Sequence, residues 1–395
     1  MTDEVKYVVA FDIGTTYSGY AYQDSKESQR DPLSIVTNSW QGGTTLSMKT
    51  PTAILFDKEK NFHSFGNDAA KAYANALETG AQHDYIFVKG FKMKLYHEEK
   101  VSDTLFLKDT EDRDIDGMLV FTELIKSLKK DAMADMAKRL GEFDKDKVTF
   151  VLTVPAIWRE PAKQFMRLAA EKAEIKPENL ILALEPEAAA LYCKNLELNS
   201  ALGSGDGAVK SCFQPGGKYM IMDLGGGTVD SVVHATNENS DVIELYKSSG
   251  GPWGGEYVNV NFMTYLETTY GEDAAKRFKE TRCLDHYELE QEFEEKKRKL
   301  NTANEVDVRL RIPGHLKTLA SKPIDKHTVD HLYIKKTEFK SFFDPLIEQI
   351  IQHLKSIFSE VGEIPLLFLV GGFSESAYLQ EKLREEFTNT KIVVP

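Results

Sequence analysis

The sequence predicts an α/β protein built from two similar lobes, and three observations lead to this prediction. A short apolar run at residues 7–11 ends in Asp12 and a glycine turn, and a matching run at residues 219–222 ends in Asp223 and a turn of three glycines. The two aspartates are separated by about half of the 395 residues. Apolar strands and amphipathic helices alternate between them, which is typical of sheets covered by helices. A duplicated half is the simplest explanation.

The first half continues with a strand, a helix and a second strand. Residues 148–154 are almost continuously apolar and stop at Pro155, which predicts a buried strand. The next helix has Pro161 in its first turn, and its apolar residues recur at helical spacing. They are Ala162, Phe165, Met166, Ala169, Ala170 and Ala173. Residues 180–184 predict another buried strand, which ends where Glu185 and Pro186 follow.

A helix is then expected from residue 187 towards 196, followed by a surface loop at residues 200–217 that contains five glycines. This loop divides the chain into lobe I, residues 1–214, and lobe II, residues 215–395.

The second lobe shows a charged helix, an exposed strand, a long helix and a buried strand. Residues 290–300 carry Glu–Lys and Glu–Arg pairs at i, i+4 spacing. Residues 306–312 alternate apolar and charged side chains, which predicts a strand with one exposed face. A long amphipathic helix begins near Asp344, and residues 366–370 form a buried strand that meets two glycines.

Composition argues against several classes of protein. The formal charge of −13 disfavours nonspecific binding to nucleic acid or to an anionic membrane. The three cysteines are too far apart for a metal or redox pair, which favours a reducing compartment. The N-terminus does not resemble a secretory signal, and the longest apolar stretch is far too short to span a bilayer. We therefore expect a cytoplasmic protein without membrane insertion and without a nucleic acid partner, and the oligomeric state stays open.

The two aspartate turns predict a site for a polyphosphate. Glycine allows backbone N–H groups to approach phosphate oxygens without interference from a Cβ atom. Asp12 and Asp223 would face these anions, and their repulsion implies an intervening Mg²⁺ that is held largely through water. One such turn is more simply an ordinary β-hairpin, but two copies at half-chain spacing favour a functional role. The P-loop and dinucleotide-binding fingerprints are missing from the sequence.

These residues together resemble a known family. FDIGTTYS at residues 11–18 and DLGGGTVD at 223–230 look like the nucleotide-binding domain of the seventy-kilodalton heat-shock chaperones, within the actin, hexokinase and chaperone ATPase superfamily. Further matches are TPT at 50–52, VPA at 154–156, EPEAA at 185–189, GGE at 254–256 and LVGG at 369–372. FKMKL at 91–95, PAIW at 155–158 and Trp253 look most like the divergent twelfth subfamily. The resemblance implies an actin-like ATPase fold, in which two ribonuclease-H-like halves enclose a nucleotide cleft.

The resemblance also implies roles for individual residues. Asp12 and Asp223 would anchor the waters of Mg²⁺, with Asp230 nearby. Lys92 would be the catalytic lysine that stabilises the transferring γ-phosphoryl group. Glu185 would orient water or couple hydrolysis to lobe movement. The residues that would hold the phosphates are Gly14, Thr15, Thr16, Tyr17, Gly225, Gly226, Gly227 and Thr228. Further nucleotide contacts would come from Gly254, Gly255, Glu256, Glu294, Lys297, Arg298, Asn301, Gly371, Gly372 and Phe373.

Simpler explanations exist for several of these residues taken alone. Lys92 could belong to a solvated basic surface, Glu185 could be a carboxylate at a helix start, and the 290–300 helix could be an exposed charged helix. Glu375 stands where the family usually has an arginine that stacks on adenine, and Phe373 stands where a serine is usual. The nucleotide preference therefore stays open.

The resemblance implies slow Mg²⁺-dependent ATP hydrolysis, with ATP or ADP as the bound nucleotide. The nucleotide state would change lobe closure and the affinity for a protein partner. The sequence stops before the closing helix typical of the domain and contains no peptide-binding domain, so client refolding by this chain alone is not expected. Two alternatives remain, namely a small-molecule kinase of the sugar-kinase type and a nucleotide-gated scaffold without appreciable hydrolysis.

Overall fold

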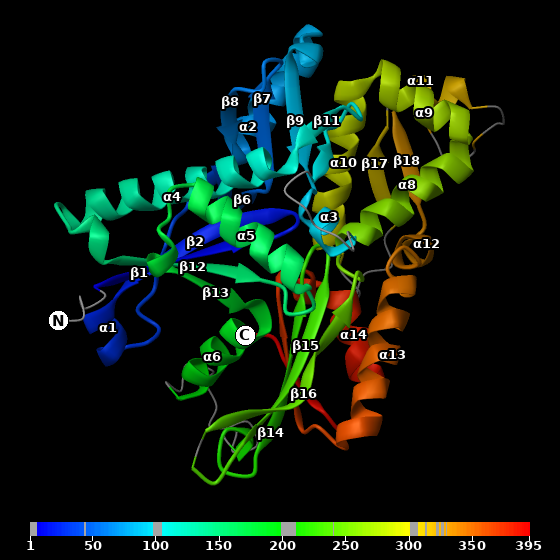
Figure 1. Cartoon of the computed structure of the whole chain (residues 1–395). Coiled ribbons are helices and arrows are strands. Elements are labelled where there is room, and N and C mark those ends of the chain that lie inside the picture. The colour runs from blue at the N-terminus through cyan, green and yellow to red at the C-terminus, as the bar shows by residue number, and fades with distance from the viewer. Residues whose placement is uncertain are drawn as a thin grey trace. The chain divides into compact units, whose positions relative to one another are not determined.

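The computed structural model of the chain divides it into two compact units, Met1–Gln214 and Pro215–Pro395 (Figure 1). Each unit contains its own mixed sheet, helices and hydrophobic core. The residues that the structure describes are 6–42, 45–97, 105–198, 211–239, 241–300, 307–312, 314–320, 324, 328 and 330–395.

The first unit is built on a sheet with the strand order β13–β12–β1–β2–β3, and β6 also pairs with β2. The central strand β1 runs parallel to β12 and antiparallel to β2, with which it forms a hairpin. The bounds are Tyr7–Ile13 for β1, Tyr17–Asp24 for β2, Val36–Thr37 for β3, Thr50–Pro51 for β6, Val148–Val154 for β12 and Leu180–Leu184 for β13. The strands expected at residues 7–11, 148–154 and 180–184 are therefore confirmed, and the first is two residues longer than predicted.

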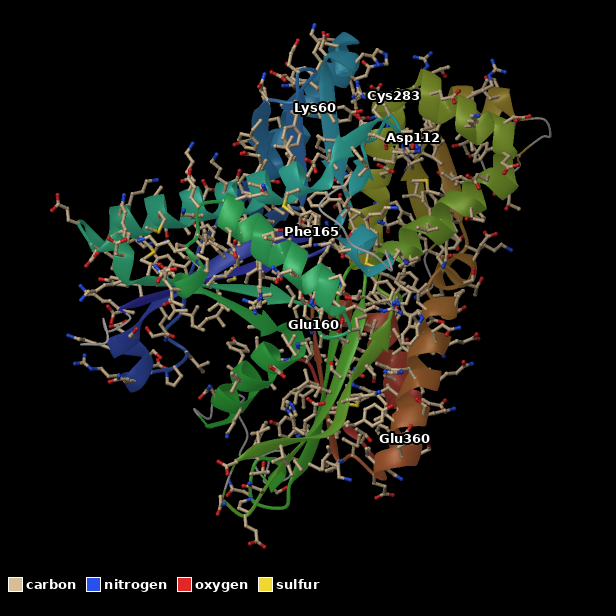
Figure 2. All side chains as sticks on the ribbon, viewed as in Figure 1. Lys60, Asp112, Glu160, Phe165, Cys283 and Glu360 are labelled. Atoms are coloured by element: carbon tan, nitrogen blue, oxygen red, sulfur yellow. The ribbon has the colours of Figure 1, made fainter. Side chains whose placement is uncertain are left out.

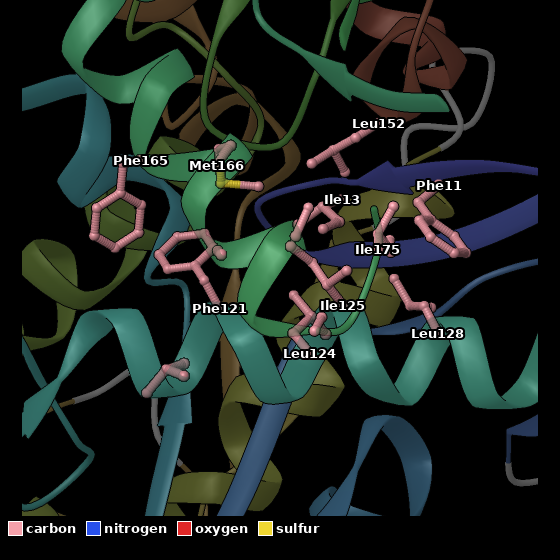
Figure 3. Packing of buried hydrophobic residues seen from close by; sticks show 14 of the residues in the cluster. Phe11, Ile13, Phe121, Leu124, Ile125, Leu128, Leu152, Phe165, Met166 and Ile175 are labelled. Atoms are coloured by element: carbon pink, nitrogen blue, oxygen red, sulfur yellow. The ribbon is translucent and has the colours of Figure 1, made fainter. Parts of the chain in front are cut away.

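Helices cover both faces of this sheet. Figure 1 shows α4 (Gly117–Leu140) and α5 (Glu160–Lys172) on one face and α6 (Glu185–Leu198) on the other. The helix expected around Pro161 is α5, and its predicted apolar stripe is buried. Figure 2 shows its exposed first residue, Glu160, and its buried Phe165. In Figure 3, Leu128 of α4 points towards Phe11 of the central strand, and both residues belong to the core that this helix shares with the sheet.

The rest of the first unit consists of short elements around this framework. β7 pairs with β8 and β9, β4 pairs with β5, and β10 pairs with β11. Their bounds are Trp40–Gly42 for β4, Thr45–Ser47 for β5, Ala53–Asp57 for β7, Phe62–Phe65 for β8, Tyr85–Lys89 for β9, Phe106–Lys108 for β10 and Asp114–Asp116 for β11. The remaining helices are α1 (Ser25–Arg30), α2 (Gly66–Thr79), α3 (Lys92–His97) and the 3₁₀ turns Gln82–Asp84, Lys145–Lys147 and Pro177–Asn179.

The second unit repeats the central arrangement of the first. Its sheet has the order β16–β15–β14–β19–β20, and β14 runs antiparallel to β15 and parallel to β19. The bounds are Lys218–Leu224 for β14, Val229–Thr236 for β15, Val242–Gly251 for β16, Leu366–Val370 for β19 and Lys391–Val393 for β20. In both units an aspartate near the end of the central strand therefore precedes a glycine-containing hairpin turn.

The helices of the second unit agree with most of the predicted pattern. The long helix expected near Asp344 is α13 (Asp344–Val361), and the charged helix is α10 (Cys283–Arg298). α10 begins seven residues earlier than predicted, because Leu289 packs in the core and the charge pairs marked only the later turns. The other elements are α8 (Glu256–Tyr270), α9 (Glu272–Thr281), α11 (Gly314–Leu319), α12 (Lys336–Lys340), α14 (Ala377–Glu386), the 3₁₀ helix Gly372–Glu375 and the pair β17 (Val308–Arg311) with β18 (His331–Ile334).

Two further predictions concern segments that the structure covers only in part. Residues 200–210 of the predicted joining loop lie outside the described residues, as does residue 306 of the predicted strand. Within the described ranges, no helix combines the length and apolar character that crossing a membrane requires.

Candidate nucleotide site

The first predicted phosphate turn connects β1 to β2 and requires glycine at its first position. The Gly14 N–H donates to the Tyr17 carbonyl at 3.1 Å, which closes the turn. A Cβ atom on residue 14 would lie 2.4 Å from the same carbonyl oxygen, a distance that no side chain tolerates. Thr52 fastens the turn from outside, because its hydroxyl donates to the Gly14 carbonyl at 2.7 Å and its N–H donates to the Thr16 carbonyl at 2.8 Å.

Asp12 lies one residue before the end of β1 and forms a hydrogen-bonded ion pair with Lys49. Partial desolvation would raise the pKa of the half-exposed Asp12 carboxyl, but the charge and hydrogen bond of Lys49 and the charge of Lys92 lower this pKa below its usual range. Asp12 is therefore an anion at neutral pH. No motif marks Lys49, which directly precedes the TPT match at residues 50–52.

Lys92 and Glu185 form a buried ion pair within the first unit. Lys92 is the first residue of α3 and Glu185 is the first residue of α6. The Lys92 Nζ atom lies 2.8 Å from Glu185 Oε1, and the two side chains are only 6% and 13% exposed. The same ammonium lies 5.5 Å from the centroid of the Trp158 ring, a cation–π distance. A solvated basic surface is therefore not the environment of Lys92.

The second predicted phosphate turn connects β14 to β15 and is held by backbone hydrogen bonds. Gly225 N–H donates to the Thr228 carbonyl at 2.9 Å. The carbonyls of Gly225, Gly226 and Gly227 each accept a backbone N–H from residues 254–256, at distances of 3.1, 2.8 and 3.2 Å. A Cβ atom at Gly254 would lie 2.2 Å from the Gly226 oxygen, so the close approach of these two segments depends on glycine.

Asp223 is close to Gly371, which follows β19. Gly371 has φ +82° and ψ 161°, a region that only glycine adopts readily. A Cβ atom there would lie 2.3 Å from Asp223 Oδ1 and 2.6 Å from the Leu224 carbonyl oxygen. Asp230 is the hairpin partner of Asp223 and is buried. Gly371 therefore fits closely against the carboxylate predicted to anchor Mg²⁺.

Phe373 was predicted as a nucleotide contact, and the structure places its ring in the core of the second unit. The ring stacks on Phe343 with a centroid distance of 6.4 Å, and the residue is 6% exposed. A Cβ atom at Gly255 would lie 3.1 Å from Phe373 Cδ2, so the ring packs against the segment that holds the second turn. The predicted contact of Phe373 with nucleotide stays a prediction.

The residues predicted on the adenosine-contacting helix form a compact hydrogen-bond network. Lys297 is buried and donates to Gly255 O at 3.0 Å, to Asn259 Oδ1 at 3.0 Å and to Glu294 Oε2 at 2.5 Å. An ammonium has three N–H donors, so these acceptors use all of them.

The carboxylate of this network is Glu294, which also accepts from Arg298 Nε at 2.9 Å and from Asn259 Nδ2 at 2.9 Å. Burial alone would raise the pKa of Glu294, but Lys297 and these hydrogen bonds lower it below its usual range. The network joins α10 to the start of α8. Asn301, the fourth predicted residue, lies outside the described residues.

The donors in these turns suit Mg²⁺ bound mainly through water. Among the described residues, no three His, Cys, Asp or Glu side chains are grouped so that they could bind a metal directly. The carboxylates near the turns are Asp12 in the first unit and the paired Asp223 and Asp230 in the second, and Mg²⁺ keeps several of its waters while it takes one or two carboxylates.

Comparison with known proteins gives matches along almost the whole chain. The family model described as Hsp70 protein matches residues 8–393. Heat shock 70 kDa protein 12A of Homo sapiens and of Mus musculus are each 32% identical over 455 residues, which covers 98% of this chain and 67% of the relative. Heat shock 70 kDa protein 12B of Homo sapiens is 31% identical over 457 residues, with 98% and 66% covered. The chain thus spans about two thirds of the length of these curated relatives.

Proposed function

The chain belongs to the Hsp70 protein family, and on this premise we propose that it is a nucleotide switch that hydrolyses ATP slowly with Mg²⁺. Membership implies the actin-like ATPase fold and a nucleotide-binding, chaperone-like protein. The observation that carries the proposal is the repeated hairpin, in which an aspartate near the end of the central strand precedes a glycine turn in each unit. Slow hydrolysis, lobe closure and a protein partner are parts of this proposal.

The turns and aspartates would bind the phosphates and the metal. Backbone N–H groups of residues 15–17 and 226–228, with the hydroxyls of Thr15, Thr16 and Thr228, are suited to phosphate oxygens, whereas the Gly14 and Gly225 N–H groups close the turns. Asp12 and Asp223, supported by Asp230, would hold the waters of Mg²⁺. When bound, Mg²⁺ neutralises charge on the phosphates. Closure of the lobes on the nucleotide would then change the surface offered to a protein partner.

Lys92 would supply the positive charge that stabilises the γ-phosphoryl group during transfer, while Glu185 holds the ammonium and orients water. The support is the buried ion pair, because a desolvated ammonium acts more strongly on a developing charge than a solvated one. Lys92→Ala should lower single-turnover hydrolysis by about 10²–10³-fold and leave ADP affinity nearly unchanged.

This substitution also leaves Glu185 buried without its ammonium, so urea unfolding has to show that the variant is folded before its turnover is compared. Unchanged turnover in a folded Lys92→Ala protein would remove Lys92 from the mechanism.

Asp223→Ala tests the metal role in the second unit. It should weaken ADP binding with Mg²⁺ more than ADP binding in EDTA, because only the former uses the carboxylate. Calorimetry in both buffers measures the two losses, and equal losses would contradict the role.

The hydrolysis assay can also include a panel of sugars with labelled ATP. Phosphate transfer to a sugar that outpaces hydrolysis would favour a small-molecule kinase. Tight ADP binding without single-turnover hydrolysis would favour a nucleotide-gated scaffold.

A further inference from the structure

The ion pair between Lys49 and Asp12 gives the proposed metal site an unexpected neighbour. Asp12 is one of the two aspartates that would anchor Mg²⁺, and an ammonium of this chain is hydrogen-bonded to its carboxylate. The two side chains are 49% and 42% exposed. Exposed ion pairs contribute little to folding because water and salt screen them. A purely stabilising role is therefore a weak explanation for this pair.

The backbone of the first unit holds Lys49 in this position. The adjacent strand β6 pairs with β2, where Thr50 lies opposite Ser18. Thr50 is buried, and its hydroxyl accepts the Asn67 N–H at 3.0 Å. The backbone of Lys49 is thus attached directly to a fixed point of the first unit.

A glycine makes room for this segment beside Asp12. Gly19 lies directly opposite Asp12 in the β1–β2 hairpin. A Cβ atom on residue 19 would lie 2.9 Å from the Met48 carbonyl oxygen and 3.2 Å from Lys49 Cγ. The segment before Thr50 therefore packs directly over the bare backbone of Gly19. This contact brings the Lys49 stem alongside Asp12.

We propose that Lys49 is an internal counter-ion that takes the place of Mg²⁺ on Asp12 and reduces the dependence of nucleotide binding on the metal. The inference rests on the proposed function, because it assumes that phosphates bind at the turn after Asp12. Without metal, the ammonium neutralises a carboxylate that would otherwise repel the phosphates. With metal, hydrated Mg²⁺ has to displace this ammonium. Both effects bring the affinities with and without Mg²⁺ closer together.

Calorimetric titration of ADP into the full chain, with Mg²⁺ and with EDTA, tests the proposal. The quantity compared is the ratio of the Kd in EDTA to the Kd with Mg²⁺. Lys49→Met should raise this ratio by about fivefold or more. Two unit charges about 4 Å apart in a water-like dielectric interact by an energy that corresponds to about fivefold in Kd. Lys49→Arg keeps the charge and should stay near the wild-type ratio.

A matched control comes from Lys108, which lies 2.8 Å from Asp114 with side chains 58% and 59% exposed. Lys108→Met removes a similarly exposed, ion-paired lysine from the same unit, and the ratio should not change. Gly19→Ala keeps every charge but displaces the 48–49 segment, so it should shift the ratio in the same direction as Lys49→Met.

The outcomes separate this inference from the proposed function. A Lys49→Met ratio within twofold of wild type, in proteins that bind ADP, would overturn the role of Lys49 alone. An equal rise of the ratio in Lys108→Met would also overturn the role of Lys49, because the rise would then follow from the net charge of the protein and not from the position of the lysine. Failure of every variant and of the wild type to bind ADP would refute the proposed function and, with it, the inference.

Discussion

Replacing Gly371 by alanine tests whether the close approach of this backbone positions Asp223. Gly362 offers a matched control, because its φ of +74° and ψ of −163° fall in the same glycine-only region as Gly371. A Cβ atom at Gly362 would have no neighbour within 4 Å, whereas one at Gly371 would lie 2.3 Å from Asp223 Oδ1. Both substitutions therefore introduce the same kind of backbone strain, but only Gly371→Ala also introduces a steric clash.

The expected magnitudes follow from these two contributions. Adopting this backbone region costs a non-glycine residue about 1–3 kcal/mol, and both variants should lose that stability. Relief of the clash at Gly371 requires a shift of about 1 Å, since contacting heavy atoms prefer about 3.5–4 Å. Overpacking of this kind adds about 1–3 kcal/mol. Gly371→Ala should therefore be less stable than Gly362→Ala by about 1–3 kcal/mol.

Urea unfolding measures the difference in stability, and calorimetry with ADP measures its functional consequence. Because the shift displaces the Asp223 carboxylate, Gly371→Ala should lose ADP affinity with Mg²⁺ and keep most of its affinity in EDTA. Gly362→Ala should behave like wild type in both buffers. Equal stabilities for the two variants, together with an unchanged Mg²⁺ dependence, would refute the reasoning.

Two further predictions concern the second unit. Lys297→Met should lower stability by about 3–5 kcal/mol in urea unfolding, because it leaves Glu294 buried without its ammonium. Adding Glu294→Gln should recover part of this loss. A loss under about 1 kcal/mol would contradict a structural role for Lys297. Burial holds the pKa values of His234 and His353 below their usual range, and for His353 this effect outweighs the opposing hydrogen bond with Ser249. Both histidines therefore contribute stability that is fully present above about pH 6.5 and decreases as the pH falls, by up to about 1.4 kcal/mol per pH unit for each. A urea midpoint that stays constant between pH 7 and pH 5 would refute this expectation.

The sequence predicts the buried strands well, because strong signals mark their ends. The strand expected at residues 148–154 stops at Pro155, and the strand expected at residues 366–370 stops at two glycines. Both strands have the predicted bounds. The start of α10 was missed, since its first two turns lack the charge pairs that identified the helix. Periodicity and composition report local structure, so they locate elements better than they locate contacts between elements.

The candidate site shows the same division between local and tertiary information. Asp12 and Asp223 could be identified because each sits in a short motif at a strand end. The ion pairs of Lys49 with Asp12 and of Lys92 with Glu185 join residues 37 and 93 positions apart, and no local pattern encodes such distances. Only the family resemblance singled out Lys92, and nothing in the sequence singled out Lys49.

The two glycine turns differ in what fastens them, and this difference determines how each can change during evolution. The Thr52 hydroxyl holds the first turn at Gly14 and the Thr52 main-chain N–H holds it at Thr16, so a substitution at Thr52 removes the first of these bonds and can leave the second. Main-chain N–H groups secure the second turn at all three glycine carbonyls, and every residue type except proline supplies such a group. A change of side chain at residue 52 can therefore weaken the first turn, whereas the second turn is sensitive to substitution at Gly254, which donates one of these bonds and has no room for a side chain.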